Sequence, residues 1–309
     1  MAVAALGSRL AENVSRAVKV PEGALRNLLV CLMSQGHVLI EDYPGVGKTA
    51  LARALARSID AEYARLQCTA DMLPGDVVGT NVYNQRENRF EFRPGPVFAN
   101  VVLVDEVNRA SPRTQAALLE PMEERQATVD GATHPLPDPF FVVATQNPAG
   151  AAGTFPLPES QLDRFSIVCT IGLPAREAER EILSGRGGPD VLDDVQPVTS
   201  PAVLAGAVQR VRQVHCAASV VDYVLDVATA TRTHPEVLIG ASPRASLGLL
   251  HCAQAHATVA GRDFVSPDDV KAVAPHALAH RIVLSNGVDT PAAMRVLQEI
   301  VTHVATPRP

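Results

Sequence analysis

The segment Asp42-Tyr43-Pro44-Gly45-Val46-Gly47-Lys48-Thr49 decides the fold class of this 309-residue chain. It follows the apolar run 38–40, which is typical of a buried strand, and it precedes residues 50–56, which are strong helix formers. A strand, a glycine-containing loop and a helix in this order form the context that a phosphate-binding P-loop requires. An ordinary glycine-rich turn before a core helix is the alternative, and motifs further along the chain decide between the two.

The chemistry of this loop suits a nucleotide. Gly45 and Gly47 have no side chain, so the backbone can approach a phosphate closely. The amides of the loop and of the helix N-terminus would point at the anion. Lys48 would reach the β and γ phosphates, and the Thr49 hydroxyl would bind Mg²⁺. We therefore predict that the nucleotide is bound by Pro44, Gly45, Val46, Gly47, Lys48, Thr49 and Ala50.

A second motif follows the apolar run 101–104, which ends in Asp105 and Glu106. A continuous apolar run is typical of a parallel strand buried on both faces. Carboxylates at its end would lie where ligands bind in open α/β sheets. We expect Asp105 to hold Mg²⁺ together with Thr49, and Glu106 to activate the attacking water. A strand that merely ends in solvated charge is the alternative, which the preceding P-loop motif disfavours.

A third apolar run, residues 140–145, leads into Gln146-Asn147-Pro148. The amide of Asn147 could form a hydrogen bond with the γ phosphate or with the water that attacks it. Taken alone, an asparagine before a proline more often forms a turn.

Several longer motifs resemble those of one family, the MoxR family of AAA+ ATPases. The resemblance extends from about residue 36 to about residue 281 and is carried by long, ordered segments. These are residues 104–120 (VDEVNRASPRTQAALLE), 122–126 (MEERQ), 153–165 (GTFPLPESQLDRF), 240–245 (GASPRA) and 261–265 (GRDFV).

The resemblance implies a role for individual residues. Lys48 and Thr49 correspond to the Walker A pair, Asp105 and Glu106 to the Walker B pair, and Asn147 to sensor 1. Arg164 resembles the arginine finger that reaches the nucleotide of a neighbouring subunit, and Arg244 resembles sensor 2, which links the lid to the γ phosphate. Arginine suits both roles, because its planar fork of donors matches phosphate oxygens. The alternative for Arg164 is a surface arginine paired with Glu159 or Asp163. The expected catalytic residues are Glu106, Asn147, Arg164 and Arg244.

Three features depart from the family pattern. Asp42 replaces the first glycine of the P-loop, and its carboxylate near the phosphates would weaken nucleotide binding slightly. Pro121 interrupts the helix after Glu106 and should kink or end it. Residues 149–152 are Ala-Gly-Ala-Ala where the family often carries acidic residues, which puts the local loop in doubt but not Asn147.

The element pattern predicts two domains. Strands and helices alternate up to about residue 173, and only helical patterns follow. This predicts an α/β P-loop NTPase (AAA+) base of residues 1–173, with three αβα layers and a parallel sheet, and a smaller all-α lid of residues 174–309. Within it, residues 89–93 and 128–133 show hairpin patterns that could contact a partner or could be plain loops. Ser242-Pro243 and Ser266-Pro267 mark helix starts in the lid, and residues 185–189 mark a turn or hinge.

Composition excludes several classes of protein. The formal net charge of −6 disfavours a constitutive nucleic-acid binder, which needs a basic surface. No window is apolar enough to span a membrane, and the N-terminus does not resemble a signal peptide, so a cytoplasmic protein is expected. The five cysteines lack metal-binding spacing and are expected to be reduced and mostly buried. His276 and His280 could share a metal, but no third ligand is evident.

The resemblance implies a function as well as a fold. Family members couple hydrolysis of Mg-ATP to chaperone-like remodelling or maturation of a protein client, act as hexameric rings, and have partners that contain von Willebrand factor A domains. The expected cofactors are therefore ATP and Mg²⁺, and the expected partners are further copies of the chain, such a domain and a client. The alternative is a nucleotide-dependent switch that gates a complex without remodelling. Glu106 and Arg164 disfavour it, because a pure binder needs neither a lytic base nor an arginine in trans.

Overall fold

The computed structural model describes residues 3–43, 45–146, 153–184, 192–287 and 289–307. Its centre is a parallel five-stranded sheet with the order β2-β5-β8-β1-β9. The strands are β1 (Val38–Glu41), β2 (Tyr63–Gln67), β5 (Val101–Asp105), β8 (Phe141–Gln146) and β9 (Ile167–Cys169). The apolar runs of the sequence thus form neighbouring strands, and their polar ends meet at one edge of the sheet.

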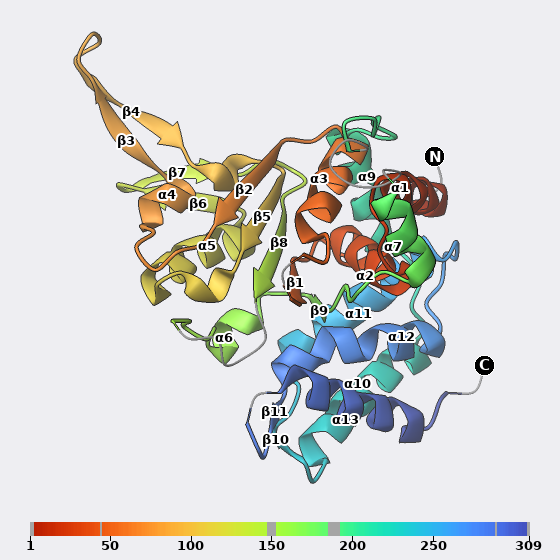
Figure 1. Cartoon of the computed structure of the whole chain (residues 1–309). Coiled ribbons are helices and arrows are strands. Elements are labelled where there is room, and N and C mark those ends of the chain that lie inside the picture. Colours follow the sequence, from red (N-terminus) through yellow and green to blue (C-terminus); the bar gives the residue numbers. More distant parts are fainter. Residues whose placement is uncertain (1–2, 44, 147–152, 185–191, 288, 308–309) are drawn as a thin grey trace.

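Alternation along the strands divides the core in two. In β1, Val38 and Ile40 face one cluster of buried side chains, and Leu39 faces the other. Helices α1 (Val3–Ala17), α2 (Glu22–Met33) and α3 (Lys48–Ser58) supply the first cluster, and α4 (Pro74–Val78) and α5 (Pro112–Glu124) supply the second. Successive strand side chains point to opposite faces, so a continuous apolar run requires cover on both. The result is the expected three-layer αβα arrangement (Figure 1).

Two antiparallel hairpins extend from this core. The first joins β3 (Gly79–Asn84) to β4 (Arg89–Pro94) and projects far from the rest of the molecule (Figure 1). The second joins β6 (Gln126–Val129) to β7 (Ala132–Pro135) through Asp130 and Gly131, which both have positive φ. Both hairpin predictions are confirmed, and the strands are longer than predicted because the pairing continues beyond the alternating residues. Short helices complete this part of the chain: η1 (Pro96–Phe98), η2 (Val107–Arg109) and α6 (Glu159–Leu162).

The rest of the chain is mainly helical. Its helices are α7 (Arg176–Leu183), α9 (Pro201–Val211), α10 (Ala218–Thr233), α11 (Pro243–Val259), α12 (Pro267–Leu278), η3 (Ala279–Arg281) and α13 (Thr290–His303). Ser242 caps α11 by accepting the amide of Ala245, and Ser266 forms a capping box with Asp269 at the start of α12, as their patterns predict. Two short strands, β10 (Val237–Ile239) and β11 (Val283–Leu284), pair in this region and were not predicted. The predicted turn or hinge at residues 185–189 lies outside the described residues.

This helical region packs directly on the base. Helix α11 contacts α1 and α2, and α12 contacts β9. One buried cluster therefore includes side chains from both sides of residue 173. The division into a base of residues 1–173 and a lid of residues 174–309 stays a prediction.

Pro121 does not end its helix. It is buried inside α5, which continues to Glu124. Proline removes one amide donor, but Leu118 and Met122 on the same helix are buried in the core, and this packing stabilises the last turn. Of the two expected effects of Pro121, ending the helix is excluded for this reason, and a kink at Pro121 stays a prediction.

The cysteines and the histidine pair have structural environments. All five thiols are free, and four are buried. Burial raises the pKa of Cys169 to about 12 and that of Cys252 to about 11, so neither is a reactive thiolate. A ring nitrogen of His276 forms a hydrogen bond with Val168 O, and one of His280 does so with Phe165 O. Both rings therefore hold the segment around β9. None of the described helices is long and apolar enough to cross a membrane.

Candidate nucleotide-binding site

A cavity of about 560 Å³ opens at the edge of the sheet where β1, β5 and β8 end. Seven predicted nucleotide-binding residues and Glu106 line it: Gly45, Val46, Gly47, Lys48, Thr49, Ala50, Asp105 and Glu106. Pro44 and Asn147 lie outside the described residues, as do residues 149–152. The cavity thus brings together two motifs separated by more than fifty residues.

The loop has the backbone that phosphate binding requires. Gly45 and Gly47 have φ of 90° and 92°, in the left-handed region that side chains disfavour. Gly47 is the residue just before α3, so the first amides of that helix face the cavity. Lys48 is buried and donates from Nζ to Asp42 O at 2.6 Å. Burial lowers the pKa of Lys48, whereas the carboxylates of Asp42, Asp105 and Glu106 act in the opposite direction.

Asp42 has a structural role that the sequence did not reveal. Its side chain accepts three backbone hydrogen bonds, from Tyr43 N at 2.9 Å, Ile171 N at 2.9 Å and Gly172 N at 2.7 Å. The φ of Asp42 is not positive, so the loop forms without a glycine at this position. These bonds can form because the chain after β9 passes beside β1. The expected effect of the Asp42 carboxylate on nucleotide binding stays a prediction.

Asp105 is held by two partners. Its Oδ2 lies 2.7 Å from Arg65 Nε and 2.6 Å from Arg65 Nη2, and its Oδ1 accepts from Thr145 Oγ1 at 3.4 Å. Arg65 comes from β2 and Thr145 from β8, the two strands that flank β5. The Asp105 side chain is 12% exposed, so this carboxylate is nearly enclosed. Sequence reasoning missed both partners, since nothing local marks them.

Glu106 has a distinct backbone. Its φ of 54° is left-handed, which costs a non-glycine residue about 1 kcal/mol or more. The conformation is fixed by a hydrogen bond from Glu106 N to Thr145 Oγ1 at 3.0 Å. Its Oε2 lies 3.0 Å from Arg109 Nη1. The turn brings the second carboxylate to the cavity beside the first.

One wall of the cavity is apolar. It is formed by α1, by α7 and by residues that follow β9 and precede α9. Its members are Ala17, Val18, Pro174, Ile182 and Leu192. An apolar wall opposite a phosphate cradle suits a flat, weakly polar base. No sequence motif marked these residues, which lie far apart along the chain.

The donors present fit a triphosphate with a divalent cation. Lys48 is a buried ammonium among carboxylates, the glycine backbone is open, and a hydroxyl and a nearly enclosed carboxylate share the same cavity. Mg²⁺ prefers such oxygen ligands and usually keeps several waters.

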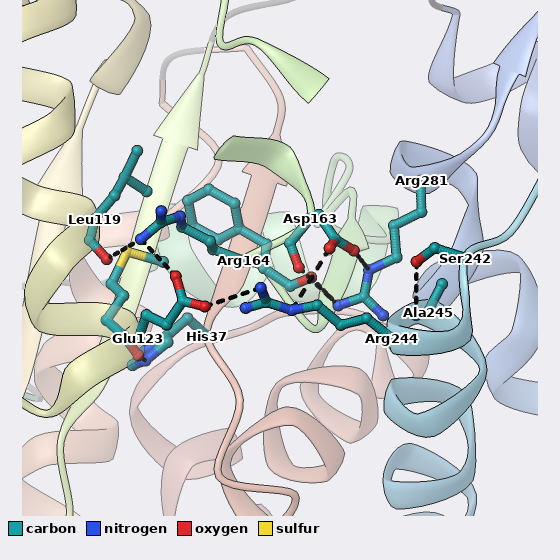
Figure 2. Close-up of polar contacts among 11 residues, drawn as sticks. His37, Leu119, Glu123, Asp163, Arg164, Ser242, Arg244, Ala245 and Arg281 are labelled. Carbon is teal, nitrogen blue, oxygen red and sulfur yellow. Dashed lines mark hydrogen bonds and ion pairs between the residues drawn. The ribbon is translucent and has the colours of Figure 1, made fainter. Parts of the chain in front are cut away.

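Arg164 and Arg244 do not line the cavity at the P-loop. Both line a second cavity of about 530 Å³ and are not among the residues that line the first. Arg164 Nη1 lies 2.8 Å from Glu123 Oε2 and donates to Leu119 O, so its partner is neither Glu159 nor Asp163 (Figure 2). Arg244 Nη1 lies 2.9 Å from the other Glu123 oxygen, and its Nε lies 3.5 Å from Asp163. In this arrangement Arg244 does not reach the P-loop of its own chain.

Comparisons with known proteins agree with this geometry. The model of the ATPase family associated with various cellular activities (AAA) matches residues 37–167, and that of the AAA lid domain matches residues 229–302. The chain is 45% identical to YeaC of Bacillus subtilis, a protein of uncharacterised function, over 90% of this chain and 88% of YeaC. It is 40% identical to the chaperone MoxR1 of Mycobacterium tuberculosis, over 96% of this chain and 81% of MoxR1.

A solved structure is similar over almost the whole chain. It is that of a Cytophaga hutchinsonii protein described as a candidate ATPase, with a TM-score of 0.86 and 34% identity, covering 97% of this chain and 94% of that one. The P-loop cavity, the parallel sheet, the lid match and the identity to MoxR1 lead to one conclusion: this chain belongs to the MoxR family of AAA+ ATPases.

Proposed function

We propose that this protein hydrolyses Mg-ATP and uses the energy to remodel or mature a protein client. The observation that carries the proposal is the meeting of Lys48, Thr49, Asp105 and Glu106 in one cavity. A phosphate cradle alone would support binding. A metal-binding carboxylate next to a second carboxylate adds the means to cleave the terminal phosphoryl bond.

The residues divide the work in a simple way. The loop amides and Lys48 would hold the phosphates, and Thr49 and Asp105 would hold magnesium, which would neutralise charge on the phosphate groups. Glu106 orients a water and accepts its proton. Asn147, by family resemblance, would hold the γ phosphate or this water. The apolar wall would accept the base.

We further propose that turnover requires a neighbouring subunit. Arg164 and Arg244 share Glu123 in the second cavity, away from the P-loop of their own chain. Both would therefore act on the nucleotide of the next subunit in a ring, which by family resemblance is a hexamer. An arginine supplied in trans stabilises charge in the transition state and typically contributes a factor of 10³ or more.

The relatives point to the kind of work done. MoxR1 carries the name chaperone, and we extend that activity to this chain. A partner with a von Willebrand factor A domain and a cytoplasmic location follow from family resemblance in the same way. The projecting β3–β4 hairpin is the candidate contact with a partner or client, since Phe90 near its tip is 70% exposed.

Mixing two inactive variants tests the ring. Lys48→Ala should lose Mg-ATP binding in calorimetry, and Arg164→Ala should bind Mg-ATP but lose most hydrolysis. Mixed rings should regain activity, because an intact P-loop then faces an intact Arg164. If mixed rings form and remain inactive, action in trans is wrong. If wild type takes up no Mg-ATP, the proposed function as a whole is wrong.

The second candidate is a nucleotide switch without remodelling. One observation favours this switch: in the separated subunit both carboxylates are paired with arginines. Asp105 is paired with Arg65, and Glu106 is paired with Arg109. Steady turnover of ATP that increases with subunit concentration would exclude the switch.

A further inference from the structure

The second cavity is built mainly from charged side chains. It lies where the end of α5, the segment after α6, the end of α9 and the start of α11 approach one another. Its arginines are Arg125, Arg164, Arg212, Arg244 and Arg281, and its acids are Glu123, Asp138 and Asp163. Five guanidinium groups against three carboxylates leave an excess of positive charge. Arg212 reinforces it, since its charge adds to burial in lowering the pKa of both Arg125 and His251.

Glu123 is the centre of this cluster. Its two carboxylate oxygens contact different arginines, Oε2 with Arg164 at 2.8 Å and Oε1 with Arg244 at 2.9 Å (Figure 2). One carboxylate thus holds two guanidinium groups from distant parts of the chain side by side. A terminal phosphate presents its oxygens to two arginines in the same manner.

Asp163 and Arg281 form a firmer pair. Arg281 is only 5% exposed, with its Nε 3.0 Å from Asp163 Oδ1. Its Nη2 donates to Asp163 O at 3.0 Å and to Phe165 O at 2.9 Å. This arginine fixes the segment that carries Arg164. By contrast Glu123 is 32% exposed and can be replaced as a counterion.

Several polar atoms that line the cavity are unsatisfied. Among the described residues, Arg281 Nε and Nη1 and Arg164 Nε are buried without a hydrogen-bond acceptor, and Asp163 Oδ1 is buried without a donor. Room for Arg281 Nη1 depends on Gly248, where an added Cβ would lie 2.4 Å from it. Buried donors without acceptors are costly, and an anion with several oxygens would satisfy them.

We propose that Glu123 is an internal counterion that occupies the place of a phosphate group, and that the terminal phosphates of the neighbouring subunit's nucleotide displace it. This inference rests on the proposed function, because it assumes that Arg164 and Arg244 bind the nucleotide of a neighbouring subunit. In a separated subunit the carboxylate keeps Arg164 and Arg244 together. On assembly the more highly charged phosphate takes over both contacts, so the nucleotide helps to hold the two subunits together.

The first experiment measures the anion site in the separated subunit. Isothermal titration with inorganic tripolyphosphate, without metal, uses a Lys48→Ala background to suppress binding at the P-loop. Glu123→Gln should tighten binding about 2- to 30-fold, since it removes two partly exposed ion pairs, each worth a factor of about 1.4 to 5. Arg244→Ala in the same background should weaken binding.

The matched control is Glu124→Gln, which removes an exposed acid from the adjacent position and should leave the affinity almost unchanged. Glu123→Asp keeps the charge but is too short to reach both arginines, and should fall between wild type and Glu123→Gln. Circular dichroism and thermal unfolding establish that each variant is folded. If folded Glu123→Gln binds tripolyphosphate no more tightly than its parent, or if Arg244→Ala binds equally well, the inference is overturned.

The second experiment identifies the source of the phosphate. ATPase activity per subunit is followed as the concentration of the Glu123→Gln protein is varied, with Lys48 intact. Half-maximal activity should occur at a lower concentration than in wild type, by about the factor seen with tripolyphosphate. An unchanged midpoint overturns the assignment to the neighbour's nucleotide. Absence of ATPase activity in wild type refutes the proposed function instead, while the tripolyphosphate result stands independently.

Discussion

Arg65 holds the carboxylate of Asp105 through two nitrogens, Nε at 2.7 Å and Nη2 at 2.6 Å from the same oxygen. The two residues lie diagonally across the paired strands β2 and β5, although forty positions separate them in the chain. Half of the Arg65 side chain is exposed, whereas Asp105 is almost enclosed. A cation that binds Asp105 must therefore compete with this guanidinium group.

This competition predicts a change in magnesium dependence. Arg65→Gln should lower the Mg²⁺ concentration that half-saturates nucleotide binding by about 2- to 5-fold, the worth of one partly exposed ion pair. Fluorescence titration of a labelled nucleotide at several Mg²⁺ concentrations measures it. Arg53→Gln is the control, because Arg53 lines the same cavity but pairs with Asp193. Equal Mg²⁺ midpoints in Arg65→Gln and wild type would contradict the prediction.

Glu106 is expected to act in the chemical step and not in binding. Glu106→Gln keeps the size of the side chain and removes the base, so the turnover number should fall by roughly 10² or more while nucleotide affinity is retained. Phosphate release and calorimetry separate the two quantities. Turnover at the wild-type rate would remove Glu106 from the mechanism. A client that stays bound to this variant in ATP could be purified with it and identified.

His37 predicts a pH dependence of stability. Val142 N donates to its Nδ1 at 3.0 Å and its Nε2 lies 3.0 Å from Met122 O, so the ring is neutral with the proton on Nε2. A second proton would have to bind Nδ1, where it would point at the Val142 N–H and remove the acceptor of that hydrogen bond. Burial is the main cause that lowers the pKa of His37 to about 3, with Arg125 adding to it. Because the unfolded chain binds the proton at a higher pH, stability should fall as pH decreases from about 6.5 towards 3.

Urea unfolding at pH 7.5 and 5.5 measures this effect. One such histidine should cost wild type about 1 kcal/mol between these values. His37→Gln should reduce the difference by that amount, and replacement of the exposed His303 should not. His280 contributes in the same direction, since burial also lowers its pKa to about 3. An unchanged pH dependence in His37→Gln would show that His37 is not the group responsible.

Asp269 should be the most sensitive acid of the lid. Its side chain is fully buried and is bound by Arg262, His256 and Ser266. Burial alone would raise its pKa, but these partners hold the pKa well below its usual range. Asp269→Ala should destabilise the protein by about 3–5 kcal/mol, because it leaves Arg262 without its partner. Asp268→Ala, at a neighbouring side chain that is 89% exposed, should be nearly neutral in the same thermal unfolding experiment. Similar losses in both variants would contradict this account.

The sequence by itself determined the local elements. The strand, loop and helix around Lys48 could be predicted, because glycine freedom, apolar runs and helix propensity act within a few residues. The caps at Ser242 and Ser266 bond three residues ahead, so their motifs are complete in the sequence. The Asp105–Glu106 pair could be placed because parallel strands end at one edge of a sheet.

Only the tertiary structure decided which side chains meet. Asp42 accepts the amide of Ile171, which is 129 positions away, and Arg244 reaches Glu123 across 121 positions. No local sequence pattern indicates such contacts, because they depend on how the helical region packs against the sheet. The same packing placed Arg164 and Arg244 around one carboxylate, away from the P-loop of their own chain. Local chemistry identified the residues that can bind phosphate, and long-range packing determined from which side each can reach it.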